Sequence, residues 1–426
     1  MATMLQRTDD DPSAAERVRW NRRSIYRVPE GMKEQTKSEA YRPLFVSLGP
    51  FHHGDPRLVP MEEHKRRAVL HLVRRAGRPL RDFVAAMEAV ADELLDAYGD
   101  LGEQWLGGSG TDCFLEVMLA DGCFLLEMMR TRERVLRGET LEDYAPNDPV
   151  FSIHGFYFLR PEIQSDLLLM ENQLPLLVLQ RILVVQHGIS SPSAEDINKM
   201  VLHFLELEWP LHADMDTLGL HPLDLVHKSS REPPPTLSDL ADEWEADTAM
   251  PCAAELSDAG IRFKESKTKS IDFRNGVLRM PIVRVYDGTD KTFLNLMAFE
   301  RLHVFAGHDV TDYVLFMDSI ISSERDVALL RSKGLVKSGL GSDREVAELF
   351  NTISKGAVMS PFCRLLDVQR KMNDHCRKPM NRWRATFEHT YLSNPCVFIS
   401  LLAAIVVLVG TVLQVVYAAV SYYDNR

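Results

Sequence analysis

The chain has 426 residues and a formal net charge of −12, from 49 Lys and Arg against 61 Asp and Glu. This length allows two or three domains, or one large domain with an added segment. The acidic balance excludes general nucleic-acid binding, which requires a basic surface. The 6 cysteines form no C-x-x-C pair, which favours a reducing compartment.

The N-terminal residues 1–24 are polar and highly charged, with few large apolar residues. This composition predicts a disordered segment, and it lacks the apolar core of a secretory signal. A folded body is predicted over 25–391. It begins with two extended pieces, Ile25 to Pro29 and Leu44 to Leu48, the first because Pro29 disfavours a helical conformation at the residue before it.

Most of the body has the apolar periodicity of helices. Pro60 suits the first turn of a helix that continues to Ala76, and a second helical pattern runs from Leu80 to Tyr98, where Gly99 ends it. Residues 105–111 are predicted to form a loop. A buried central helix is expected over 112–129, and a similar segment over 162–185 is broken by Pro175. Further helices are predicted at 194–208, 292–306, 309–321, 323–333, 342–355, 361–375 and 378–391, with capping boxes that begin at Ser323 and Ser342.

The composition changes around residues 228–250, which are rich in proline and then acidic. This segment is predicted to be a flexible insertion. After it, strands are expected at 261–264, 270–274 and 277–285, and Asn275-Gly276 predicts a hairpin between the last two. The predicted fold class is therefore mainly α with a small antiparallel β-sheet over 261–285, in an α+β arrangement.

The end of the chain predicts a membrane anchor. No Asp, Glu, Lys or Arg occurs between Glu388 and Asp424, and residues 397–420 are almost wholly apolar. About 20 such residues in a helix cross a bilayer. Basic residues before this stretch, Arg377, Lys378, Arg382 and Arg384, predict that the body faces the cytoplasm and that the short tail 421–426 lies on the other side. A buried core helix is the alternative for 397–420.

Histidines near the start of the body suggest a metal site. His52 and His53 are adjacent and His64 follows, and neutral imidazoles bind zinc. Adjacent side chains point in different directions, however, and no H-E-x-x-H motif or cysteine completes a ligand set. The alternative is a structural turn, which Gly49, Pro50 and Gly54 favour.

A polar triplet interrupts the apolar run at 166–179, namely Glu171, Asn172 and Gln173. Pro175 lacks an N–H and disrupts the preceding turn, which leaves carbonyl groups without helical partners. The amide side chains are expected to bond to these carbonyls. A ligand or partner site is the alternative for the triplet.

Recognisable catalytic motifs are missing from the sequence. There is no phosphate-binding P-loop, and Gly107-Gly108-Ser109-Gly110 does not complete G-x-S-x-G, because Thr111 stands in the last position. Glu116, Asp121 and Glu127 are spaced by five and six residues, which does not place all three on one helix face. The basic stretch 364–384 fits either an anionic lipid surface or the solvated side of the last helices. The sequence thus predicts no catalytic residue, cofactor or metal, and an unrecognised enzyme such as a metal-dependent hydrolase is the alternative.

A series of sequence blocks resembles the plant domain of unknown function 247 family, also called UPF0481. The resemblance spans residues 25–420 and is carried by IYRVP (25–29), YRPLFVSLGPFHHG (41–54), MEEHK (61–65), DGCFLLE (121–127), DLLLMENQLPLLVL (166–179), AAELSDAGIRFK (253–264), FRNGVLRMP (273–281), FLNLMAFE (293–300), DVTDYVLFMDSIISSERDVALL (309–330) and LGSDREVAELFN (340–351).

This resemblance implies a plant protein with one C-terminal membrane helix and no established activity or catalytic residues. In grasses, similar proteins resemble the pollen-side determinants of self-incompatibility. The expectation is a membrane-anchored interaction, signalling or recognition protein with an unidentified protein partner. The segment 228–250 departs in composition from the blocks around it and is the place expected to carry member-specific recognition.

Overall fold

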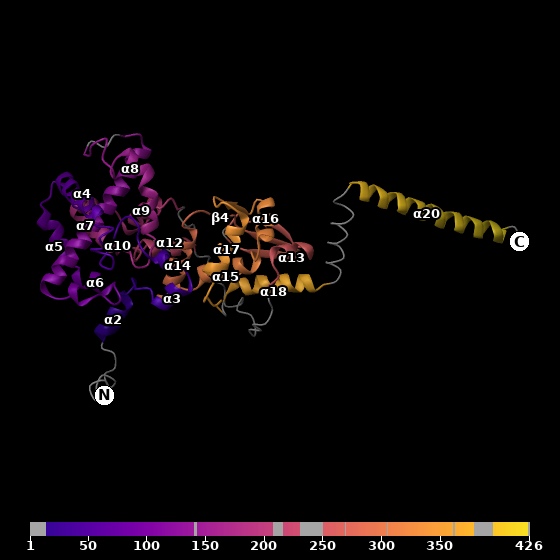
Figure 1. Cartoon of the computed structure of the whole chain (residues 1–426), viewed down its shortest axis with the longest axis horizontal. Helices are drawn as coiled ribbons and strands as arrows, with labels where there is room; N and C mark the ends of the chain where they lie inside the picture. Colours follow the sequence, from indigo (N-terminus) through magenta and orange to yellow (C-terminus); the bar gives the residue numbers. More distant parts are fainter. Residues whose placement is uncertain are drawn as a thin grey trace, which may run out of the picture. The chain divides into compact units, whose positions relative to one another are not determined.

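The computed structural model describes residues 14–139, 143–207, 216–230, 250–268, 270–304, 306–360, 363–378 and 395–424. The chain divides into two compact units. Unit 1 comprises residues 1–237, 286–316 and 348–363, and unit 2 comprises residues 238–285, 317–347 and 364–426. Most of the described residues outside loops are helical, and the strands form two small sheets (Figure 1).

Unit 1 is helical. Its elements are α2 (Ala14–Arg22), α3 (Glu30–Gln35), η1 (Ser38–Tyr41), α4 (Pro60–Ala76), α5 (Leu80–Glu88), α6 (Ala91–Asp96), η2 (Glu103–Trp105), α7 (Gly108–Leu136), α8 (Ile153–Phe158), α9 (Arg160–Asp166), α10 (Leu176–His187), η3 (Gly188–Ser190), α11 (Ala194–Phe204), α12 (Pro222–Ser230) and α14 (Thr289–Leu302). Unit 2 contains α13 (Ala253–Asp258), α16 (Glu324–Ser332), α18 (Arg364–Arg377), α20 (Pro395–Asp424) and the strands. Two helices, α15 (Asp309–Ile320) and α17 (Asp343–Ile353), have residues in both units.

The predicted central helix is α7, which is longer at both ends than the expected 112–129. Its 29 residues begin inside the stretch predicted as a loop, at Gly108. Side chains such as Phe114, Cys123 and Phe124 are fully buried. Helices α4, α5 and α10 all pack against α7 and surround it (Figure 1). This helix is therefore the core of unit 1.

The helices around α7 follow the predictions with two differences. Helix α4 begins at Pro60 and ends at Ala76, as expected, and the next residue, Gly77, adopts a left-handed conformation. The pattern from Leu80 to Tyr98 forms two helices instead of one, because Val90 leaves the helical conformation at φ −126°. The segment 162–185 forms α9 and α10 with a non-helical turn between them, and α10 begins directly after Pro175.

Unit 2 contains the strands β1 (Arg262–Glu265), β2 (Asp272–Arg274), β3 (Val277–Met280), β4 (Val283–Val285) and β5 (Val336–Ser338). The predicted hairpin is present: β2 pairs antiparallel with β3 through Asn275 and Gly276, which both have positive φ, at 52° and 72°. The prediction of a wholly antiparallel sheet is wrong. Strand β1 pairs with β3 in parallel, and β4 pairs with β5 in parallel in a separate sheet, so the sheets are mixed.

The stretch 277–285 forms two strands and not one. Pro281 follows β3 and lacks the N–H that a continuing ladder would require. Strand β4 then pairs with β5, a strand that the sequence analysis did not predict. The later helices agree with the predictions to within a few residues. The capping box at Ser323 is formed, and at Ser342 the side-chain hydroxyl accepts the N–H of Glu345 at 3.2 Å and donates to its carboxylate at 3.1 Å.

Two segments predicted to lack regular structure are partly helical. Helix α2 occupies Ala14–Arg22, so the prediction of disorder over 1–24 is wrong there. Arg19 and Arg22 both form ion pairs with Asp96 of α6, a tertiary contact that the composition of the segment does not reveal. The predicted insertion 228–250 begins inside α12, which ends at Ser230, and 231–249 lie outside the described residues, as do 1–13.

The C-terminal helix α20 has 30 residues, and its described side chains are those of residues 399, 400 and 402–418. No helix among the described residues is long and apolar enough to cross a membrane. The membrane span over 397–420 stays a prediction. The helix expected at 378–391 falls almost entirely outside the described residues, apart from Lys378, which is not helical.

Candidate functional site

The family-like blocks of unit 1 meet around an irregular backbone segment, residues 44–49. This segment follows η1 and makes no regular ladder, so its buried N–H groups need other acceptors. Asp166, at the end of α9, provides the first of them. Its carboxylate accepts the backbone N–H of Leu44, at 3.0 Å and 3.1 Å to its two oxygens, that of Phe45 at 2.7 Å and that of Val46 at 3.0 Å.

The rest of the segment is hydrogen-bonded by side chains of α7 and of the turn before α10. The side-chain oxygen of Asn172 accepts the N–H of Leu48 at 2.7 Å, and its amide donates to the carbonyl oxygen of Val46 at 3.0 Å. Asp121 accepts the N–H of Gly49 at 2.7 Å. Asp121, Asp166 and Asn172 are fully buried. We call these three side chains the polar clamp.

The end of the clamped segment requires glycine at position 49. Its φ is +72°, a conformation that other residues rarely adopt. A Cβ at Gly49 would lie 2.7 Å from both the carbonyl oxygen of Gln173 and the hydroxyl of Tyr98. These two groups are bonded to each other, with the Tyr98 hydroxyl donating at 2.9 Å, so neither can move freely.

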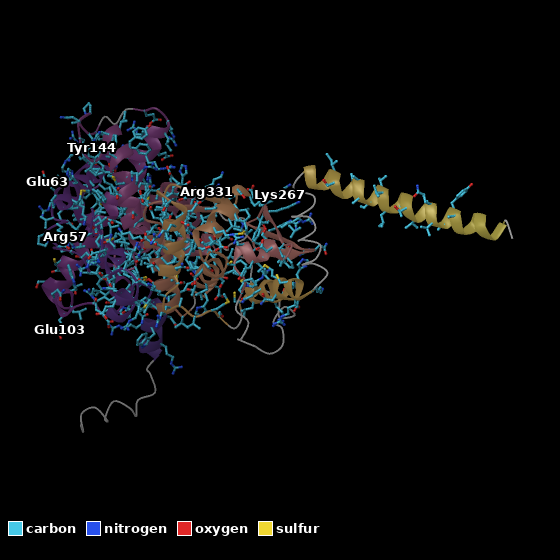
Figure 2. The ribbon with its side chains drawn as sticks, turned by 45° about the vertical axis from the view of Figure 1, so that its right-hand side comes forward. Arg57, Glu63, Glu103, Tyr144, Lys267 and Arg331 are labelled. Atoms are coloured by element: carbon cyan, nitrogen blue, oxygen red, sulfur yellow. The ribbon has the colours of Figure 1, made fainter. Side chains whose placement is uncertain are left out.

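A buried ion pair supports the clamp. The ammonium of Lys65, a residue of α4 with no exposed surface, lies 2.7 Å from Asp121 and 2.6 Å from Glu62. It also donates to the hydroxyl of Ser47 at 3.1 Å. Burial raises the pKa of the Asp121 carboxyl, whereas Lys65 and the Gly49 N–H oppose this shift by stabilising the carboxylate. Arg57 and Glu63, which are close to these residues in sequence, are exposed and point outward (Figure 2).

The predicted triplet at 171–173 lies beside the clamp and bonds to the protein itself. Glu171 accepts the N–H of Val28 at 2.7 Å and pairs with Lys33 at 2.9 Å. The Gln173 amide donates to the carbonyl oxygens of Leu167 and Leu169, at 2.5 Å and 2.7 Å. Asn172 donates to the carbonyl oxygen of Asp166 at 3.0 Å. The amides thus bond to carbonyls of the turn that precedes Pro175.

The structure does not place the three candidate histidines around a common metal position. His52 is close to Glu171, with 3.6 Å between the ring nitrogen and the carboxylate, and burial lowers its pKa to about 4. His53 packs against the ring of Trp105, and His64 contacts Arg67 at 2.9 Å. Among the described residues, no group of three His, Cys, Asp or Glu side chains is placed to hold a metal ion.

The carboxylates of α7 are also separated. Glu116 is exposed, Asp121 belongs to the clamp, and Glu127 pairs with Arg75 and Arg130 and accepts the hydroxyl of Tyr144 at 3.0 Å. Of the four basic residues before α20, Arg377 and Lys378 are exposed, and Arg382 and Arg384 lie outside the described residues.

Sequence reasoning missed Asp166 and Lys65 as members of this site. The sequence signal for both is that each is a charged residue within a block of the family resemblance, and the structure shows that both are completely buried. Asp121 was considered only as a catalytic carboxylate. These carboxylates and amides therefore have a structural role, because they form the hydrogen bonds that the buried backbone N–H and C=O groups of the protein require.

Known proteins resemble the chain over nearly its whole length. A family model described as "Plant protein of unknown function" (DUF247) matches residues 25–410. The chain is similar to UPF0481 protein At3g47200 of Arabidopsis thaliana, with 30% identity over 94% of this chain and 87% of that protein. It is also similar to putative UPF0481 protein At3g02645 of Arabidopsis thaliana, with 23% identity over 92% and 89%. No solved structure matches the chain. The chain therefore belongs to the DUF247 (UPF0481) family of plant proteins of unknown function.

Proposed function

We propose that this chain is a non-enzymatic interaction protein that is held at a membrane by its C-terminal segment, with its body in the cytoplasm. The observation that carries the proposal is that the buried carboxylates in the family blocks bond to the protein's own backbone and lysine side chains. Asp121, Asp166 and Glu171 each accept backbone N–H groups and each have a lysine nearby. Groups that are occupied in this way stabilise a framework and are not poised for proton transfer or nucleophilic attack.

The sequence supports the membrane part of the proposal. Residues 397–420 are almost wholly apolar, and no charged residue occurs between Glu388 and Asp424. The four basic residues Arg377, Lys378, Arg382 and Arg384 precede this stretch, and only Arg426 follows it. A cytoplasmic body agrees with this asymmetry, because basic residues next to a span remain on the cytoplasmic side.

The exposed apolar side chains of α8 support the interaction part. Ile153, Tyr157 and Phe158 are exposed by 59%, 61% and 66%, on a helix of only six residues. Large apolar side chains that are exposed next to one another are typical of surfaces that contact another protein. Recognition in self-incompatibility, which the resemblance to grass proteins suggests, would be one form of this function.

Membrane association is tested by deleting residues 397–420. We expect the full chain to resist extraction from membranes at alkaline pH and the deleted chain to become soluble. In sealed vesicles with the cytoplasmic side outward, protease should digest the body of the full chain. Full protection of the body would contradict the proposed orientation, and unchanged membrane retention after the deletion would contradict the anchor.

The interaction is tested by affinity capture from plant membranes with the full chain. A partner should be recovered by the wild type, lost with the variant Tyr157→Ser/Phe158→Ser, and retained with the control variant Arg66→Gln, which changes an exposed residue of α4. Recovery that is equal for all three proteins would exclude α8 as the contact. A purified chain that hydrolyses esters, peptides or phosphates in a metal-dependent manner would contradict the non-enzymatic assignment.

A further inference from the structure

Unit 1 contains a cavity that is separate from the polar clamp. Its volume is about 290 Å³, and it is lined by α3 and η1, by α14, by the beginning of α15 and by residues 353–358. This volume is close to the lower end of the range for small-molecule sites, about 300–1,000 Å³. The cavity is therefore large enough for one small organic molecule.

The inner surface of the cavity is apolar and well fixed. Leu294 and Met297 line it from α14, Ile353 from the end of α17, and Tyr41 from η1, and all four side chains are buried. The wall at 353–358 is followed by Ser360, whose N–H donates to the carboxylate of Asp312 at 2.8 Å. These packed side chains provide a preformed surface for an apolar ligand body.

The charged side chains of the cavity are all of one sign. They are Arg301 and Lys355, which line it together with the imidazole of His308, and none of its lining residues is Asp or Glu. This differs from the chain as a whole, whose formal net charge is −12. Arg301 and Lys355 are exposed, and neither forms an ion pair with another described residue. The neighbouring carboxylate Glu300 is occupied, because it bonds to His227, to the N–H of Val310 and to Thr311.

We propose that this cavity binds a small organic acid with an apolar body. The anionic group would face Arg301 and Lys355, and the apolar part would lie against Leu294, Met297 and Ile353. Arginine forms paired hydrogen bonds with carboxylates, and lysine adds a second positive charge. This binding activity is additional to the proposed interaction function and does not depend on it, because the cavity and α8 share no residues.

The test is a titration of the full chain in nanodiscs with 3-(4-fluorophenyl)propionate, followed by ¹⁹F NMR, with empty nanodiscs as the blank. We expect saturable binding to one site, and at least tenfold weaker binding of the corresponding amide, which has the same shape without the charge. Binding of acid and amide with equal affinity, or no saturable binding, would overturn the proposal.

Two pairs of variants locate the ligand. Arg301→Gln should weaken binding of the acid at least tenfold, whereas Arg66→Gln, the matched exposed control outside the cavity, should leave it unchanged. Val358 lines the cavity and is 75% exposed, so its substitution does not disturb the core. Val358→Asp should weaken binding of the acid severalfold, and Val358→Asn should not. Thermal unfolding of each variant checks that the fold is retained, and unchanged binding in both Arg301→Gln and Val358→Asp would show that the acid binds elsewhere.

Discussion

The strongest prediction concerns Asp166→Asn in the polar clamp. The substitution keeps the size of the side chain and one acceptor oxygen, but removes the negative charge that three backbone N–H groups and Lys291 share. A hydrogen bond to a charged group contributes about 1.5–3 kcal/mol and a neutral one about 0.5–1.5 kcal/mol, so each bond loses about 1 kcal/mol. Because Leu44 and Phe45 are not fully buried, we expect a total loss of about 2–3 kcal/mol for residues 44–49.

Amide hydrogen exchange measures this loss at the groups concerned. The N–H groups of residues 44–46 bond to Asp166 and exchange only when the clamp opens. With about 1.4 kcal/mol for each factor of ten, the expected loss accelerates exchange of a peptide that covers 44–49 by roughly 30- to 140-fold. A peptide from β1 to β3 in unit 2 should change little.

The control for this experiment is Asp92→Asn, the same chemical change at an exposed residue of α6. It should alter exchange in 44–49 by less than threefold. If Asp166→Asn also left the exchange of 44–49 unchanged while unit 1 remained folded, the segment would be held by packing and the clamp would have no energetic role.

Two further predictions follow from buried ionisable groups. Lys65→Met should destabilise α7 by about 3–5 kcal/mol, because Asp121 is left without its counter-ion. Adding Asp121→Asn to the same chain should recover at least about 1 kcal/mol of this loss. Hydrogen-exchange protection of residues 108–136 in the wild type, both single variants and the double variant measures the coupling energy, and additive effects of the two substitutions would contradict the prediction. Burial lowers the pKa of His221 to about 4, well below its unfolded value of 6.5, so its contribution to stability is complete above pH 6.5 and is lost as the pH falls towards 4. The free energy of unfolding should therefore fall by about 2 kcal/mol less between pH 7 and pH 5 in the His221→Gln variant than in the wild type. Urea unfolding at each pH measures this difference, and an equal fall in both proteins would refute the assignment to His221.

Local signals predicted the longer helices of this protein, whereas the short helices α8, α12 and α13 were not predicted. The start of α4 at Pro60 and the helix caps at Ser323 and Ser342 depend on residues within one turn of each other. The hairpin at Asn275-Gly276 is equally local. Such features can be inferred because the residues that decide them are adjacent in the sequence.

Pairing between distant segments could not be predicted in the same way. Strand β5 begins at Val336 and pairs with β4 more than fifty residues earlier, and β1 lies parallel to β3 although the hairpin suggested an antiparallel sheet. Short strands of three or four residues carry little periodicity, so the sequence does not determine their partners. The helix α2 was missed for a similar reason, because its ion pairs with Asp96 connect distant positions.

The polar clamp shows why charged residues in apolar blocks need a structural account before a catalytic one. An irregular segment such as 44–49 can be buried only if its N–H groups find acceptors, and each one left unsatisfied costs about 1–3 kcal/mol. Carbonyl groups inside a helix are already bonded within that helix, and here Asp121, Asp166 and Asn172 provide the acceptors with their side chains. Residues committed in this way have little freedom to create a binding specificity. Besides the segment 228–250, for which the sequence predicts member-specific recognition, such recognition is therefore expected in groups that the framework leaves unoccupied, such as the exposed side chains of α8 and the basic side chains of the cavity between α3 and α14.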